Sequence, residues 1–142
     1  EPAFAKLLGE QIATGNPFTF LGGLHLEDGR LDLKMHGLFP IVAAARALAI
    51  RHDIRAVSTR ARLEGLLSLD IGGNEDMKAM LAGHAFLIGL LLDQQTRDIY
   101  AGVPASNRVE LAAIRREEQA GLKTLIRRLQ STPQLVRDLM FR

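Results

Sequence analysis

Residues 31–49 join a short segment of alternating apolar residues directly to an alanine-rich segment with helical periodicity. In the first part, leucines alternate with Asp32 and Lys34, as on a strand that has one buried face. Gly37 then marks a turn, and from 38 to 52 the apolar side chains recur every three or four residues. The sequence therefore predicts a strand that turns into a helix, with Asp32 and Lys34 on the same side of the strand.

The composition favours a helical domain. Apolar residues make up 47% of the 142 residues but aromatic residues only 5%, so the core must consist of Leu, Ile, Ala and Met. Such side chains suit closely packed helices. A chain of this length fits one domain, and we expect a single helical domain over 1–142. Because the chain begins with Glu1 instead of Met, we also expect it to be the C-terminal part of a longer multidomain protein.

Charge and cysteine content limit the partners and the location. The net charge is only +2, which gives no electrostatic argument for binding nucleic acid. No apolar run approaches the roughly 20 residues that a membrane-spanning helix needs. The chain contains no cysteine, which excludes disulfides and thiolate metal sites and fits a reducing cytoplasm. We therefore expect a cytoplasmic protein without a membrane or nucleic-acid partner.

Turn and breaker residues divide the chain into helical segments, which we expect over 4–13, 38–52, 58–69, 75–100, 109–130 and from 132 onwards. Between 18 and 33, apolar residues alternate around Asp28 and Gly29, which predicts a β-hairpin. The segment 75–100 is apolar on nearly every face between 81 and 92, as expected of a helix at the centre of a bundle. The predicted fold class is all-α: an up-and-down helical bundle with a small N-terminal β-hairpin.

Glu118 is the one carboxylate that falls within the apolar stripe of the segment 109–130. A carboxylate in such a position costs several kcal/mol unless it is paired. One interpretation is that Glu118 faces a cleft and contacts a ligand. The other, which we favour, is that it pairs with an arginine of a neighbouring helix or lies where the stripe reaches solvent.

The segments 31–34, 37–42 and 45–49 are similar to the signature of a bacterial family, the putative nucleotidyltransferase substrate-binding domain. Further similarities, less specific, occur at Gln95, at the turn from Gly102 to Pro104, at Asn107 and at 127–130. Family members form the C-terminal domain of predicted signal-transduction proteins. In those proteins the domain follows CBS or cyclic-nucleotide-binding-like modules and a nucleotidyltransferase domain related to the uridylyltransferases that modify nitrogen-regulatory proteins.

The resemblance implies a non-catalytic accessory domain that binds the acceptor substrate of a nucleotidyltransferase. Its partners would be the nucleotidyltransferase domain of the same chain and a protein substrate. Mg²⁺ and a nucleoside triphosphate would act in the parent protein, and no cofactor is expected here. The residues themselves suggest the contacts: Asp32, Lys34 and Arg46 could together orient a nucleotide or an acidic protein substrate, with Lys34 and Arg46 as the hydrogen-bond donors, and Glu118 is the fourth predicted substrate-binding residue. The family usually has a basic and a small residue where this chain has Met35 and His36.

Motifs for catalysis are missing from the chain itself. The four histidines show no His-x-x-x-His spacing, so no metal site is predicted. A nucleotidyltransferase active site needs a Gly-Ser pair followed by carboxylates at Asp-x-Asp spacing, because two metal ions hold the triphosphate. Neither pattern occurs, so we expect no catalytic residue, and an independent enzyme is the least favoured interpretation.

Two other interpretations stay open at this point. The charges of Asp32, Lys34 and Arg46 could form a structural ion-pair cluster that holds the hairpin against the bundle. The whole chain could also be a protein–protein interaction module, or a homodimerisation module, that uses the apolar segment between 81 and 92 as its contact surface.

Overall fold

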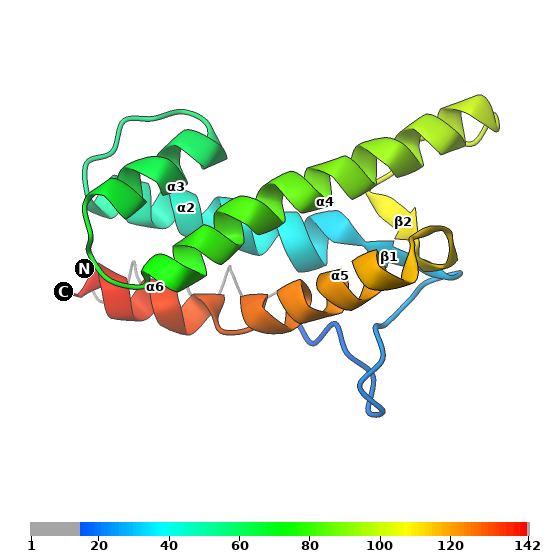
Figure 1. Cartoon of the computed structure of the whole chain (residues 1–142), viewed down its shortest axis with the longest axis horizontal. Helices are drawn as coiled ribbons and strands as arrows, with labels where there is room; N and C mark the ends of the chain where they lie inside the picture. Colours follow the sequence, from blue (N-terminus) through cyan, green and yellow to red (C-terminus); the bar gives the residue numbers. More distant parts are fainter. Residues whose placement is uncertain (1–14, 142) are drawn as a thin grey trace.

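The computed structural model describes residues 15–141, so the helix predicted over 4–13 lies outside the described residues. Within them, the chain runs through β1 (Arg30–Asp32), η1 (Lys34–Leu38), α2 (Phe39–Arg51), α3 (Thr59–Ser68), α4 (Asn74–Tyr100), β2 (Arg108–Glu110), η2 (Leu111–Ala113), α5 (Arg116–Leu129) and α6 (Thr132–Met140). Most of this part is helical, and β1 and β2 form a small antiparallel pair (Figure 1). The predicted fold class, an all-α helical bundle with a small β-hairpin, is confirmed in its helical character and in its small antiparallel pair, although the second strand of that pair comes from residues 108–110.

Helix α4 runs across the whole molecule, and the other helices pack against it or against one another (Figure 1). Helix α2 contacts α3 and α6, and α3 contacts the first part of α4. Four alanines of α2 are buried and allow these close approaches. One core is shared by β1, α2, α3, α4 and α5. Its fully buried side chains include Leu31, Leu48, Leu63, Met77, Leu87 and Ile126. Aliphatic side chains fill this core, as the low aromatic content predicts.

The junction after β1 differs from the prediction. Strand β1 ends at Asp32, and Leu33 already has helical backbone angles (φ −69°, ψ −26°). Lys34 therefore begins the π-helical turn η1, and the expectation that Asp32 and Lys34 share one face of a strand is wrong. The side chain of Asp32 explains why the strand stops, because its Oδ1 accepts a hydrogen bond from the backbone N–H of Met35 (2.9 Å).

The turn predicted at Asp28 and Gly29 is present. Both residues have positive φ (51° and 74°), and Glu27 and Arg30 exchange two backbone hydrogen bonds of 2.9 Å across it. Strand β1 then pairs with β2, which is distant in the sequence. Arg108, the first residue of β2, comes 76 positions after Asp32, the last residue of β1. In this pairing Leu31 lies opposite Val109, and both are fully buried.

The start of the predicted helix 109–130 needs correction. Residues 108–110 form β2, Leu111–Ala113 form a 3-10 turn, and α5 begins only at Arg116. Backbone bonds to β1 and its turn explain the difference, because Leu33 donates to the carbonyl of Asn107 (3.0 Å) and Leu111 to that of Gly29 (3.2 Å). Pairing with a distant strand overrides the local helical pattern.

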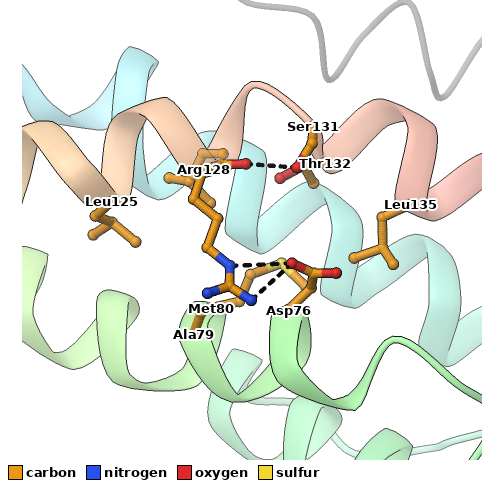
Figure 2. Close-up of a pocket in the computed structure, with 9 residues that line it drawn as sticks. Asp76, Ala79, Met80, Leu125, Arg128, Ser131, Thr132 and Leu135 are labelled. Atoms are coloured by element: carbon orange, nitrogen blue, oxygen red, sulfur yellow. Dashed lines mark hydrogen bonds and ion pairs between the residues drawn. The ribbon is translucent and has the colours of Figure 1, made fainter.

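Helix α4 is not enclosed on all sides as a helix at the centre of a bundle would be. Gly73, with φ 67°, precedes its first residue Asn74. Near this start, Asp76 pairs with Arg128 in the last turn of α5 (3.1 Å), so each charge lies at the helix end whose dipole it complements (Figure 2). One face of α4 is buried, whereas Ala82, Ala85 and Leu92 on the opposite face are exposed. The expectation of a fully enclosed helix is therefore wrong.

Two glycines in helices give opposite expectations for alanine. A Cβ at Gly37 would lie 2.7 Å from Cδ1 of Leu87, which is fully buried, whereas a Cβ at Gly89 would have no atom within 4 Å. We expect Gly37→Ala to lower the free energy of unfolding by about 1–3 kcal/mol through overpacking. Gly89→Ala should raise it by up to about 1 kcal/mol through helix propensity. Urea unfolding at low protein concentration measures both, and equal effects would contradict this packing.

Candidate functional site

A polar pocket of about 210 Å³ lies where the segment before β1 meets β1, η1 and β2. The residues that line it are Asn16, His25, Glu27, Arg30, Asp32, His36 and Arg108. Every one of them has a charged or hydrogen-bonding side chain. The segment that precedes β1 is tied to the bundle by Phe18, whose ring lies under the guanidinium of Arg127 at 5.2 Å. The pocket is therefore built from segments that are far apart in the sequence.

Two other hollows are less suited to a polar ligand, one because it is too small and the other because it is mainly apolar. The cavity beside Asp76 and Arg128 holds only about 10 Å³, room for a single water molecule (Figure 2). An open groove of about 430 Å³ between α4 and α5 is lined mainly by alanine, glycine and leucine, with Thr124 and Arg128 as its polar members. The polar pocket is the better candidate for orienting a ligand through hydrogen bonds.

Arg30 is held rigidly at the pocket. Its Nη1 and Nη2 donate to Oδ2 and Oδ1 of Asp98 at 2.9 and 2.8 Å, a bidentate pair that fixes the plane of the guanidinium. Asp98 is only 3% exposed and comes from the last turns of α4. A guanidinium carries five N–H donors. Donors of Arg30 that Asp98 does not use are therefore available to a ligand.

Gln94 extends this pair into a network that joins three elements. Its Nε2 donates to Oδ1 of Asp98 (2.9 Å), and its Oε1 accepts from the backbone N–H of Glu110 and from Nη2 of Arg97, both at 3.0 Å. Gln94 is 2% exposed, so these bonds satisfy a buried amide. The network connects β1, α4 and β2 behind the pocket.

The electrostatics of Asp98 follow from this geometry. The hydrogen bonds from Arg30 lower the pKa of the Asp98 carboxyl most, and the hydrogen bond from Gln94 lowers it further, to about 2. Burial acts in the opposite direction and raises this pKa, but its effect is smaller. Asp98 is therefore ionised at neutral pH and neutralises Arg30. Arg108 is neutralised in turn by Glu27, with Nη2 and Oε2 at 2.6 Å. Both members of that second pair are well exposed, so it opens at little cost when a ligand competes.

His36 lines the pocket and carries a ring nitrogen without a hydrogen-bond partner among the described residues. This nitrogen, Nδ1, is buried. Buried polar atoms in proteins nearly always have a partner.

The four residues predicted to bind substrate lie at different places. Asp32 lines the pocket. Lys34 is exposed at the start of η1, and Arg46 is exposed on α2, roughly 18 Å further along the helix axis at 1.5 Å per residue. Glu118 pairs with Arg115 just before its own helix (3.0 Å), and this hydrogen bond lowers its pKa. Only Asp32 belongs to the pocket, and the ligand contacts of the other three stay predictions.

Sequence reasoning missed the arginines of the pocket. The turn predicted at Asp28 and Gly29 and the helix predicted over 109–130 single out neither Arg30 nor Arg108. A signal was available on α4, because Gln94 and Asp98 follow Leu87 and Leu91 on its buried face. Polar side chains at such core positions require buried partners. That pattern would have indicated a polar network at this end of the helix.

The structure thus defines a helical-bundle domain with a small polar pocket at the end that carries β1 and β2. Residues 1–139 match the family described as putative nucleotidyltransferase substrate binding domain, and the chain belongs to this family. The resemblance read from 31–49 is confirmed. No curated protein and no solved structure gives a significant match.

Two searches over residues 15–141 gave negative results. None of the helices in this part is long and apolar enough to cross a membrane. Among the same residues, no group of three or more His, Cys, Asp or Glu side chains is placed to hold a metal ion.

The depressed pKa of Asp98 predicts a loss of stability in acid. Its value is about 2 in the folded chain against an ordinary 3.8, so the ionised carboxyl stabilises the fold above pH 3.8, and this contribution disappears as the pH falls through 2. In Arg30→Met the pKa of Asp98 should rise, since the largest cause of the shift is removed, and the chain should be less stable at pH 7.

NMR titration of the Asp98 carboxyl and urea unfolding at several pH values measure both effects. Arg55→Met is the matched control, because Arg55 and its partner Asp53 are both well exposed. An Asp98 pKa that is equal in the wild type and in Arg30→Met would contradict the network.

Proposed function

We propose that this chain is the accessory domain that holds the acceptor substrate for a nucleotidyltransferase domain of the same protein, and that the polar pocket contacts the acceptor. The family to which the chain belongs supports the general role. The observation that supports the site is the pocket itself. The polar pocket lies at the junction of β1 and η1. The hydrogen bonds among Arg30, Gln94 and Asp98 hold Arg30 in place at this pocket.

The chemistry of the pocket suits a role in positioning. It contains two guanidiniums and two carboxylates, so its formal charge is balanced, and it offers both donors and acceptors. Glu27 and Arg108 can separate to contact opposite ends of a polar group, whereas Arg30 stays fixed. Holding an acceptor in one orientation speeds a transfer reaction without any catalytic group on this chain.

The wider setting is part of the proposal. The nucleotidyltransferase domain would supply the Mg²⁺ ions and bind the nucleoside triphosphate, and a protein could be the acceptor. We place the parent in the cytoplasm of a bacterium as a signal-transduction protein with CBS or cyclic-nucleotide-binding-like modules. This setting requires a Gly-Ser pair followed by Asp-x-Asp in the parent sequence. Their absence would remove its basis.

Steady-state kinetics of the parent protein test the pocket. Arg108→Met should raise the KM for the acceptor by roughly tenfold and leave the KM for the nucleoside triphosphate unchanged, because only acceptor binding uses this arginine. Arg128→Met is the matched control. Arg128 is also paired with a carboxylate, that of Asp76, but it lies in the last turn of α5 and does not line the polar pocket. Unchanged KM values in Arg108→Met would contradict the pocket, and a raised nucleotide KM would assign it to the nucleotide.

Lys34 can be tested separately, because it lies just outside the pocket. If Lys34 contacts a phosphate of the nucleotide at the domain interface, Lys34→Ala should weaken the binding of nucleoside triphosphate to the parent. The expected loss is a few-fold, since an exposed charge contributes little. Calorimetric titration of the wild type and Lys34→Ala measures it, and equal affinities would remove Lys34 from the site.

A further inference from the structure

Helix α4 has a second apolar face, which points away from the core. We call it the outer seam, and its residues are Ala82, Ala85, Gly89, Leu92, Thr96, Ile99 and Val103, the last just beyond the helix. All seven are exposed; Leu92 has 56% and Ile99 66% of its surface accessible. The buried face of the same helix, which includes Leu87, Leu91 and Gln94, lies on the opposite side.

The spacing of the outer seam indicates what kind of element would cover it. Its members follow one another at alternating intervals of three and four residues, as do the contact positions of paired helices. Thr96 fits this pattern, because its hydroxyl donates to the carbonyl of Leu92 (2.8 Å) and therefore needs no partner outside the helix. The seam is suited to another helix.

The two ends of the outer seam differ in side-chain size. The first three members, Ala82, Ala85 and Gly89, are small, whereas Leu92, Ile99 and Val103 are large. The apolar groove of about 430 Å³ between α4 and α5 adjoins the small end and includes Ala82 in its lining. At the large end, α4 projects beyond the other helices, and Tyr100 beside the seam is 89% exposed (Figure 1).

We propose that two copies of this chain associate through their outer seams with the α4 helices antiparallel. In this register Gly89 of each copy lies opposite Leu92 of the other, and Ala82 lies opposite Ile99. Ile99 and Tyr100 of each copy then enter the groove beside Ala82 of the other. Each contact occurs twice around a two-fold axis, as in an isologous dimer.

The antiparallel direction follows from the sizes of the side chains. A parallel pair would place Gly89 against Gly89 and Ile99 against Ile99, which leaves a gap at one end and crowds the other. The antiparallel pair places Gly89 opposite Leu92 and Ala82 opposite Ile99, so that a small residue faces a large one at both positions and the large end of each copy meets the groove of the other. This complementarity within one chain is the reason for a second copy of the chain as the occupant.

The area of the seam sets the strength of the interaction. The stretch from Ala82 to Ile99 is roughly 26 Å long at 1.5 Å per residue. Beyond this single pair of helices, the contact includes only the two flanking grooves, so we expect a small interface and a weak, reversible dimer.

Cross-linking tests the direction. The chain has no cysteine, so substitutions introduce the only thiols. Chains carrying Ala82→Cys and chains carrying Ile99→Cys are mixed and oxidised; both sites are exposed, so the fold should tolerate them. We expect a disulfide between the two kinds of chain and none between identical chains. Cross-links between identical chains only, or no cross-links, would overturn the proposal.

Sedimentation equilibrium of the 142-residue chain tests the association itself. We expect a dimer that forms with rising concentration and is weakened at least about tenfold by Ile99→Asp and by Gly89→Leu. Val57→Asp is the matched control, because Val57 is an apolar residue outside the seam that is even more exposed (86%) than Ile99. A monomer at all concentrations up to about 1 mM, or a dimer unaffected by both seam substitutions, would refute the pairing.

Discussion

The bidentate pair between Arg30 and Asp98 is the interaction on which the pocket end of the molecule depends. It links residues 68 positions apart and anchors β1 to α4. A two-stranded pair as short as β1 and β2 is not stable alone in water. Asp98 and Gln94 supply what the strands lack, because one binds the side chain of β1 and the other accepts from the backbone of β2. The charged pair thus adds to the burial of Leu31 and Val109 in fixing two strands of only three residues each.

The same pair limits how the pocket can change. A buried carboxylate without its arginine is strongly disfavoured, so Arg30 cannot leave Asp98 to follow a ligand. Arg108 has no such restriction, since its partner Glu27 is exposed. The pocket therefore combines one fixed and one adjustable guanidinium. That combination suits the orientation of a ligand, because the fixed group sets the geometry and the adjustable group closes on it.

Local periodicity was sufficient to predict the helices but not the site. The helices predicted over 38–52, 58–69 and 75–100 agree with α2, α3 and α4 to within one or two residues, because their apolar spacing decides which face is buried. Residues 109–113 were predicted as helix and are not, since their conformation is set by pairing with β1. The pocket combines residues from Asn16 to Arg108, and no pattern within a window of the sequence brings them together.

Helix α4 contributes both to the hydrogen-bond network behind the pocket and to the outer seam. Because the helix repeats every 3.6 residues, these two sets of residues face opposite sides of it. Asp98 and Ile99 are neighbours in the chain, yet one is buried in the pocket network and the other is exposed on the outer seam. Arg97 lies between them in the chain and belongs to the network, since it donates to Gln94. None of the seam residues takes part in the network, so we expect substitutions there to leave its hydrogen bonds intact and to disturb association without disturbing ligand binding. Because the net charge is only +2, little repulsion opposes the approach of two such seams.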